Sequence, residues 1–545
     1  MSKKVRGLTL LISLMVTLLI LLGTFGTASA CTAILVGKDA SVDGSVMTTH
    51  TCDGWYDNRI RIVPGKTFEK GTMVPVYKEI CHLTRPGVEL IKVGEIPQVE
   101  KTYTYFHVGY PFMNEHQVMI GESTFGGRRE LVNPDGMMII EQLEIFGLQR
   151  AKTARECIKI MGALAEKYGY GDGGESLTVI DPNEAWLFEI VGPGPLWTPE
   201  SGKPGAIWAA QRIPDDHVSV VANRSRLGEL HLEDPDYFMA SKNVFSFAEE
   251  MGWWDPATEP FVFWKAYCPE PYGHPFYQRR REWRVLSLLA PSLNLDPWAE
   301  RYPLSVKPDR KVSVQDLIAI NRDYYEGTEF DLTKGLAAGP FGTPNRYATP
   351  SKVRPEGRKN LDWERAISMF RCSYSFVAQA RDWLPNPIGG VLWFGEDAPH
   401  STCYVPFYCG ITQVPKSFST GRRDIFDRDS AWWAFNFVSN WADLKFSYMI
   451  EDIKAVQNEL EGDFFAMQPA IERAALEMYR RDPSLAIKFL TDYSNSCANR
   501  AVDTWWKLAD ELIAKYDDGY VDGKSVGYPT WWLEEVGFGL STREK

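Results

Sequence analysis

The chain has 545 residues, of which 44% are hydrophobic and 24% are charged, and its formal net charge is −12 at pH 7. This composition is typical of a globular protein with a substantial core. The acidic balance argues against a nucleic-acid-binding protein, because such a protein needs a basic surface. With only 9 cysteines, the chain is not a disulfide scaffold. The odd count leaves at least one thiol unpaired, and Cys31 is our candidate, whereas Cys403 and Cys409 are near enough in sequence to pair.

Residues 1–30 have the three parts of a secretory signal peptide: a basic start, an apolar run over residues 8–22, and Ala28-Ser29-Ala30 at the end. Small residues at the −1 and −3 positions suit a leader peptidase. The apolar run is shorter than the about 20 residues that a membrane-spanning helix needs. We therefore expect cleavage after Ala30, which leaves residues 31–545 as a secreted or extracytoplasmic protein without a membrane anchor.

Strands are predicted along the first part of the expected mature chain. "CTAILVG" alternates small and apolar residues from Cys31, the turn Asp43-Gly44 follows, and "VMTTH" continues the hairpin. "QVMIGESTFGG", "MMIIEQL" and the two sides of Asp181-Pro182-Asn183 also read as strands. "TARECIKIMGALAEKYG" has the spacing of a helix that ends at Gly169.

The residue composition of the chain changes after about residue 234. Residues from about 235 to 357 are rich in Pro, Trp and charge and predict a helix-rich insertion. Strands return at "SYSFVAQ", "GGVLWFGE" and "STCYVPFY", and a helical C-terminal region runs from about 428 to 545. Because strands group with strands and helices with helices, the pattern favours an α+β protein over a βαβ alternation.

A cysteine exposed by cleavage after Ala30 would carry both a thiol and a free α-amine. The amine titrates at about 7.7–8.0 and a free thiol at about 8.5, so the amine of Cys31 can accept the thiol proton near neutral pH. Such a nucleophile needs a carboxylate beside the amine and amide donors for the oxyanion. Asp53 on the return strand is the candidate carboxylate, although an ordinary Asp-Gly turn explains it equally well. Asn223, after the buried-looking strand in "VVANRSRLG", is the candidate oxyanion donor.

Other polar residues are candidates for contacts with a substrate. They lie on the hairpin, in "MNEHQVMIGESTFGG" and after Asn223, where charged and amide side chains suit the ends of a small ligand: His50, Asn114, Glu122, Ser123 and Arg226. For His50, residue type alone favours core packing over a contact with the substrate. Arg281 and Arg284 in "QRRREWR" are candidates of the same kind, in a pattern that also suits an exposed helix face.

Taken together, these segments resemble the secreted cysteine dipeptidases among the N-terminal-nucleophile hydrolases, relatives of bile salt hydrolase and penicillin V acylase. The resemblance rests on "CTAILVGKDASVDGSVMTTHTCDG", "MNEHQVMIGESTFGG", "GDGGESLTVIDPNEAWLFEIVGPGP", "WAAQRIPDDHVSVVANRSRLGE" and "RRREWRVLSLLAPS", in this order. It implies a four-layer αββα sandwich of two antiparallel sheets, the N-terminal-nucleophile hydrolase fold, with added helical segments.

The resemblance also implies roles for individual residues. Cys31 would be the nucleophile and base, and the residues around it would be Asp53 near the amine, Asn223 in the oxyanion hole and Arg281, or else Arg284, as the distant arginine. There is one departure from the pattern. The bile salt hydrolase relatives carry an arginine a few residues before the aspartate, where this chain has Thr48-Thr49-His50. His50 would fill that place, which leaves open the group that polarises the thiol.

The expected function is hydrolysis of dipeptides with a free amino end, through a thioester acyl-enzyme and without a cofactor or metal. One alternative is an acyl-amide hydrolase of the same fold that acts on bile salts, penicillin V or N-acyl amino acids. Another is a lipoprotein anchored at Cys31, which Ala28 at the −3 position disfavours. A metal peptidase is disfavoured because the sequence has no HExxH motif. The sequence leaves the oligomeric state open, a homo-oligomer included.

Overall fold

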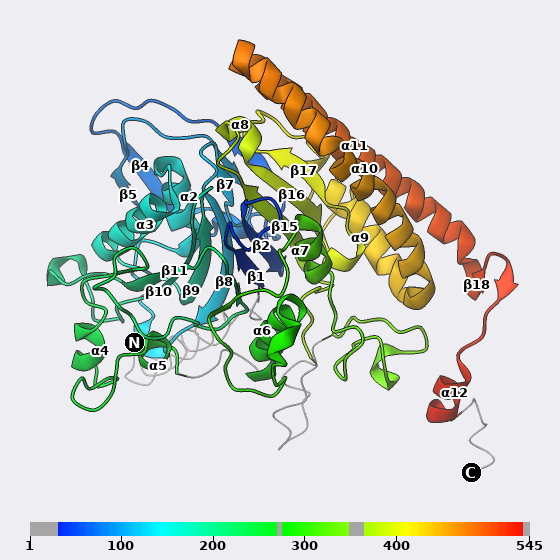
Figure 1. Cartoon of the computed structure of the whole chain (residues 1–545), viewed down its shortest axis with the longest axis horizontal. Coiled ribbons are helices and arrows are strands. Elements are labelled where there is room, and N and C mark those ends of the chain that lie inside the picture. Colours follow the sequence, from blue (N-terminus) through cyan, green and yellow to red (C-terminus); the bar gives the residue numbers. More distant parts are fainter. Residues whose placement is uncertain (1–30, 270–274, 348–363, 538–545) are drawn as a thin grey trace, which may run out of the picture.

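The computed structural model describes residues 31–269, 275–347 and 364–537 (Figure 1). The predicted signal peptide, residues 1–30, lies outside these ranges. None of the helices in the described ranges combines the length and the apolarity that crossing a bilayer requires. All nine cysteines lie in the described ranges, and none of them forms a disulfide, Cys403 and Cys409 included.

Two large antiparallel sheets form the centre of the protein (Figure 1). The seven-stranded sheet has the order β14 (Ser305–Val306), β12 (Val218–Val221), β1 (Ala33–Val36), β2 (Val46–Asp53), β15 (Cys372–Ala380), β16 (Val391–Glu396) and β17 (Val405–Tyr408). The eight-stranded sheet has the order β13 (Phe238–Ala240), β11 (Ile207–Ile213), β10 (Ala185–Val191), β9 (Gly174–Ile180), β8 (Met119–Gly126), β7 (Met113–Asn114), β6 (Tyr105–His107) and β3 (Arg61–Val63).

The two sheets pack face to face, with β1 and β2 against β8 and β9. The Oγ1 atoms of Thr48 and Thr178 form a hydrogen bond of 2.7 Å between the sheets. At Gly121 in β8, an added Cβ would lie 2.6 Å from the carbonyl oxygen of Thr49. Only glycine therefore allows this separation, and the close approach lies beside the start of β1, where Ala33 is also in contact.

Helices cover the outer faces of both sheets. α3 (Ala154–Tyr168) packs on the eight-stranded sheet, and α2 (Ile140–Arg150) packs beside it against α3. The seven-stranded sheet is covered by α6 (Pro275–Leu289), α7 (Val314–Asn321), α9 (Ala431–Ala442) and α11 (Pro483–Lys515). The layers are thus helix, sheet, sheet and helix, which confirms the predicted α+β sandwich of two antiparallel sheets.

Local signals identified one of the two adjoining helices and misassigned the other. α3 begins after Thr153, whose side chain accepts a hydrogen bond from the backbone N–H of Glu156, and it ends at Gly169 with φ of +79°. The predicted strand at "MMIIEQL" is wrong, because α2 begins there at Ile140. Every residue of α2 from Ile140 to Leu148 is buried. Its apolar run therefore shows neither the 3.6-residue period of a half-exposed helix nor the alternation of a half-exposed strand.

The remaining elements lie outside the two sheets. Between 235 and 347 the helices are short and separated by irregular chain; besides α6 and α7 they are α4 (Ser246–Glu250) and α5 (Phe263–Tyr267). α10 (Phe446–Arg481) and α11 form a long pair that projects beyond the sheets (Figure 1). The smaller elements are the hairpins β4 (Met73–Lys78) with β5 (Ile91–Pro97) and β18 (Tyr520–Val521) with β19 (Lys524–Ser525), and the helices α8 (Asn386–Gly389) and α12 (Thr530–Val536).

Candidate active site

Cys31 lies directly before β1 and is buried. The next residue, Thr32, pairs with Thr51: the backbone N–H of Thr51 donates to the Thr32 carbonyl at 2.9 Å, and the Thr32 N–H donates to Oγ1 of Thr51 at 3.1 Å. Continuing this register by one residue sets Cys31 opposite Cys52 on β2. Sheet pairing therefore holds the backbone at Cys31, between β12 on one side and β2 on the other.

The carbonyl oxygen of Cys31 accepts two hydrogen bonds from side chains. Oγ of Ser123 in β8 donates at 3.1 Å, and Nη1 of Arg281 in α6 donates at 2.9 Å. Arg281 is fully buried, and its Nη2 also donates to Oδ1 of Asn223 at 2.9 Å. The backbone N–H of Asn223 in turn donates to Oγ of Ser123 at 2.8 Å. We call Ser123, Asn223 and Arg281 the arginine network, because the guanidinium connects the Cys31 carbonyl to the side chain of Asn223.

Asn223 occupies a special backbone position after β12. Its φ is 59°, in the left-handed region that non-glycine residues seldom adopt. Its side-chain amide donates to the carbonyl of Thr124 at 2.7 Å, while its Oδ1 is held by Arg281. An amide nitrogen carries two N–H groups, so a second donor is available on the same atom. Strained backbone of this kind is common at functional sites.

The thiol of Cys31 faces a second group of side chains. A ring nitrogen of His50, Sγ of Cys31 and Sγ of Cys52 all lie within 4.8 Å of one another, and all three residues are buried. His50 and Cys52 are two positions apart on β2 and so point to the same side of the sheet. Nε2 of His50 lies 3.6 Å from Oε2 of the buried Glu122. We call Cys31, His50 and Cys52 the thiol cluster.

The charges in this region follow from burial and close neighbours. Burial raises the pKa of the Cys31 thiol, as do Cys52 and Glu122, whereas His50 lowers it. Burial lowers the pKa of His50, but Cys31 and Glu122 outweigh that effect and raise it to about 9. The imidazolium is therefore stabilised by the ionised forms of Cys31 and Glu122, so that His50 and the Cys31 thiol titrate as a coupled pair.

Glu122 shares its negative charge with a neighbouring carboxyl group. Burial alone would raise the pKa of Glu122, but the neighbouring His50 and Glu175 side chains lower it below its ordinary value. Burial and the charge of Glu122 raise the pKa of Glu175. Of the two carboxyl groups, Glu122 is therefore the ionised one and Glu175 the protonated one, so that the pair holds one negative charge opposite His50.

Asp53 ends β2 and is fully buried. Its Oδ2 accepts a hydrogen bond of 2.6 Å from Nη2 of Arg365, whereas its Oδ1 has no hydrogen-bond partner among the described residues. Burial raises the pKa of Asp53, while Arg365 opposes this effect. The register of β1 with β2 sets Cys31 opposite Cys52, the residue directly before Asp53.

Two of the predicted substrate contacts are engaged in the scaffold instead. Nδ2 of Asn114 donates to the carbonyls of Leu148 and Ala151, each at 2.9 Å. Arg226 forms a buried ion pair with Glu282. Arg284, the alternative to Arg281, is likewise paired, and its partner is Asp323. In the described part of the chain, none of these three side chains hydrogen-bonds or ion-pairs with Cys31. The residues that the structure gathers are Cys31, His50, Glu122, Ser123, Asn223 and Arg281.

Sequence reasoning missed Cys52, Glu175 and Arg365. Cys52 had a usable signal, because it lies two residues after His50 on a predicted strand and must share its face. Glu175 stands opposite Thr124 in the pairing of β8 with β9, which is a long-range register. Arg365 lies 312 residues from Asp53 in the chain, and no local pattern indicates that contact.

A cavity of about 720 Å³ lies beside these residues: no member of the thiol cluster or the arginine network lines it, but residues next to them in the chain do. Gly54 and Tyr56, just after Asp53, line it, as do Thr124 and Glu175 beside Glu122. Acidic and basic side chains line it: the carboxyl groups of Glu79, Glu141, Asp172 and Glu175, and the basic groups of Lys78, Arg85, Arg371 and Arg423. Such a cavity suits a small ligand that carries both a positive and a negative end.

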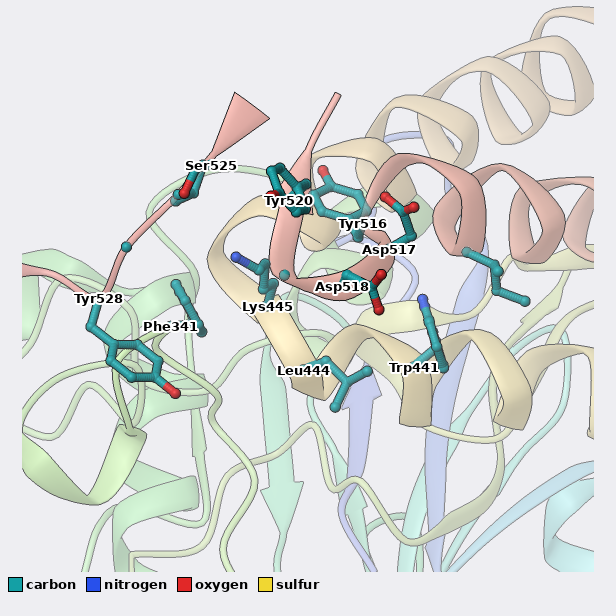
Figure 2. A pocket seen from close by; sticks show the side chains of 14 residues that line it. Phe341, Trp441, Leu444, Lys445, Tyr516, Asp517, Asp518, Tyr520, Ser525 and Tyr528 are labelled. Carbon is teal, nitrogen blue, oxygen red and sulfur yellow. The ribbon is translucent and has the colours of Figure 1, made fainter. Parts of the chain in front are cut away.

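A different hollow, of about 750 Å³, lies at the C-terminal end of α11 (Figure 2). Aromatic side chains of Phe341, Trp441 and Tyr516 border it, together with Lys445. The residues that line it include neither a member nor a chain neighbour of the thiol cluster or the arginine network. It is therefore separate from the candidate active site.

A buried cysteine with a charged histidine and a carboxylate beside its thiol, and with its carbonyl fixed by a network, defines a hydrolase of the cysteine class. The family model described as Peptidase family C69 matches residues 30–459, and the chain belongs to this family. It is accordingly a cysteine peptidase.

Individual relatives agree with this assignment. The chain is 27% identical over 407 residues to a "Probable dipeptidase" of Latilactobacillus sakei. This alignment covers 72% of this chain and 76% of the relative. It is 28% identical over 404 residues to a "Probable dipeptidase" of Salmonella dublin, and this alignment covers 71% of this chain and 82% of the relative. With "Dipeptidase A" of Lactobacillus helveticus it shares 23% identity over 505 residues, which are 90% of this chain and 97% of the relative.

Proposed function

We propose that this chain is an exported dipeptidase in which Cys31, exposed by cleavage after Ala30, acts as an N-terminal nucleophile. The names of the relatives support the substrate class. The observation that supports the mechanism is that different side chains surround the carbonyl group and the thiol of Cys31. Ser123 and Arg281 bind its carbonyl oxygen, while its thiol faces the charged imidazole of His50.

The reaction begins when the α-amine of Cys31 accepts the thiol proton. The thiolate attacks the carbonyl carbon of the substrate peptide bond, and the second N–H of the Asn223 amide stabilises the oxyanion. The α-ammonium then protonates the leaving amine as the C–N bond breaks, which leaves a thioester on Cys31. Water, deprotonated by the same α-amine, hydrolyses the thioester, releases the acid and restores the thiol.

Asp53 would hold the α-amine in place. Its Oδ1 is a buried acceptor without a hydrogen-bond partner in the described chain, and Asp53 directly follows Cys52, the residue opposite Cys31. Arg365 donates to the other carboxylate oxygen at 2.6 Å and so favours the ionised form. An ionised Asp53 stabilises the ammonium that forms at each proton transfer.

His50 would supply the fixed positive charge that an arginine supplies in the bile salt hydrolase relatives. Its imidazolium, stabilised by Glu122, lies within 4.8 Å of the thiol and favours the thiolate when the proton leaves. The histidine therefore acts as a charge beside the nucleophile, and the α-amine remains the proton acceptor.

Replacement of His50 tests this assignment through the pH profile. We expect His50→Gln to lower kcat/KM by about 100-fold, the typical effect of removing one electrostatic stabiliser, and His50→Arg to recover most of that loss. The pKa of His50 is about 9, so its charge is present below this pH and is lost above it. Activity of the natural enzyme should fall as pH rises through about 9, and His50→Arg should move this limb to higher pH. His217→Gln, on the surface, is the matched control.

If His50→Arg and His50→Gln are equally impaired and neither shifts the alkaline limb, then His50 does not act through its charge.

The adjoining cavity supports a dipeptide as the substrate. A free dipeptide has an ammonium and a carboxylate a short distance apart, and the cavity offers carboxyl groups for one and arginines for the other. Burial raises the pKa of Glu141 to about 8, so this carboxyl holds its proton until a cation arrives. A substrate ammonium would lower that pKa and bind to the ionised group.

A substrate panel tests the proposed function. With protein that begins at Cys31, we expect free dipeptides to be cleaved and N-acetyl dipeptides to react at least about 100-fold more slowly, because acetylation removes a charge that the cavity binds. Protein with two additional residues before Cys31 is expected to be inactive, since its amine is displaced. Faster cleavage of a bile salt, penicillin V or an N-acyl amino acid than of any dipeptide would favour the acyl-amide alternative.

A further inference from the structure

We infer that the thiol cluster is also a binding site for a thiophilic divalent cation such as Zn²⁺, and that the bound cation blocks the nucleophile. The site itself follows from the positions of Cys31, His50 and Cys52. The inhibitory consequence rests on the proposed function of Cys31.

The three side chains have the ligand chemistry that Zn²⁺ prefers. Thiolate sulfur and imidazole nitrogen are its usual protein ligands, at about 2.3 Å and about 2.0–2.1 Å in a tetrahedral arrangement. Such a tetrahedron separates neighbouring ligand atoms by about 3.4–3.8 Å. In the described structure the three ligand atoms lie within 4.8 Å of one another, so small side-chain rotations bring them onto one ion.

The surroundings also favour a cation. Nε2 of His50 is buried and has no hydrogen-bond partner among the described residues, although Oε2 of Glu122 lies 3.6 Å away. A carboxylate beside a histidine ligand orients the ring and increases its basicity. Once the α-amine of Cys31 is free, it is a fourth ligand, which closes a five-membered chelate ring with the thiolate of the same residue.

A fully ligated ion of this kind inhibits rather than catalyses. A catalytic zinc keeps one position open for water, whereas two thiolates, an imidazole and an amine fill the tetrahedron. Binding releases the two thiol protons and the proton of the His50 imidazolium to solvent, places the lone pairs of Sγ of Cys31 on the metal, and occupies the amine that serves as the base. The nucleophile and the base are therefore lost together, and a chelator restores both.

The test uses protein beginning at Cys31, kept reduced with a non-chelating phosphine and stripped of metal with EDTA. We expect titration with Cd²⁺ to produce the ultraviolet thiolate-to-metal charge-transfer band with saturation at one equivalent. Dipeptidase activity should fall in parallel with the band, and excess EDTA should restore it. Zn²⁺ should displace the Cd²⁺ and should protect Cys31 from alkylation by iodoacetamide.

Variants assign the ligands. Loss of a residue that only supports a ligand lowers metal affinity by about 10- to 100-fold, so loss of a ligand itself in Cys52→Ser should cost about 100-fold or more. Cys372→Ser is the matched control, because Cys372 is a buried thiol on β15, opposite Asp53, and is not part of the thiol cluster. It should bind Cd²⁺ as the natural protein does. If Cys52→Ser does not fold, the protection of Cys31 in the natural protein still decides the matter.

The absence of a charge-transfer band at one equivalent, or of protection by Zn²⁺, would overturn the inference and leave the proposed function unaffected. Unchanged affinity in Cys52→Ser would overturn it too. A band with undiminished activity would instead support the metal site and count against Cys31 as the nucleophile.

Discussion

Cys31→Ala is expected to lower kcat/KM for dipeptides by about 10⁴-fold or more, the scale seen when an enzyme loses its nucleophile. The fold should be retained, because the hydrogen bonds from Ser123 and Arg281 go to the carbonyl oxygen of residue 31 and alanine keeps that atom. The pairing of Thr32 with Thr51 also involves neither Sγ nor Cβ of Cys31. Steady-state kinetics and circular dichroism on protein beginning at residue 31 measure the two effects separately.

The control for this prediction is a second buried thiol outside the candidate site. Cys409→Ala removes a sulfur atom that contacts the carbonyl of Asn386, and it should change kcat/KM by no more than a few-fold. Residual activity above about 1% in Cys31→Ala, with the control unimpaired, would exclude Cys31 as the nucleophile. A matching loss in both variants would indicate damage to the sheet instead.

Arg281→Met is expected to have the second largest effect, because one buried guanidinium serves several acceptors. Besides the carbonyl of Cys31 and Oδ1 of Asn223, it donates to Oγ1 of Thr32 at 2.8 Å and to the carbonyl of Tyr277 at 2.7 Å. Methionine leaves these acceptors buried without their donor, which should lower the free energy of unfolding by about 3 kcal/mol or more. kcat/KM should fall by at least about 100-fold, since both the nucleophile and the oxyanion amide lose their support.

Arg284→Met on the same helix separates the two consequences. Arg284 is paired with Asp323 at 2.6 Å, and within the described residues it neither hydrogen-bonds nor ion-pairs with the arginine network. This variant should also be less stable, because it leaves a carboxylate without its partner, but the folded enzyme should keep its kcat. Denaturant unfolding and kinetics below the unfolding transition measure both properties. If Arg281→Met keeps its kcat as Arg284→Met does, then the arginine network supports the fold and not the reaction.

Much of the candidate site was predictable because its signals are local. The Asp43-Gly44 turn and the alternation on either side of it specify the hairpin of β1 with β2, which sets Cys31, His50 and Asp53 on paired strands. Side-chain alternation then gives His50 and Cys52 the same face. The helix α3 was predictable from its 3.6-residue period and its two ends.

Local patterns failed where a residue's partner is distant or where burial is complete. α2 is buried on all sides, so its apolar run did not reveal its period. Asn114 and Arg226 were assigned to a substrate from residue type alone, whereas their polar atoms are bound to α2 and to Glu282. Residue type states which bonds a side chain can make, and the fold determines which of them it makes.

The sequence by itself determined the class of chemistry: a cysteine at the head of a strand, with a histidine and an aspartate on the next strand. Only the tertiary structure decided what surrounds that cysteine. Arg281 reaches its carbonyl from 250 residues away, and Ser123 does so from 92 residues away in the other sheet. Hydrophobic period and turn chemistry act over a few residues, whereas these contacts depend on how two sheets and a helix pack, and no short stretch of chain encodes that packing.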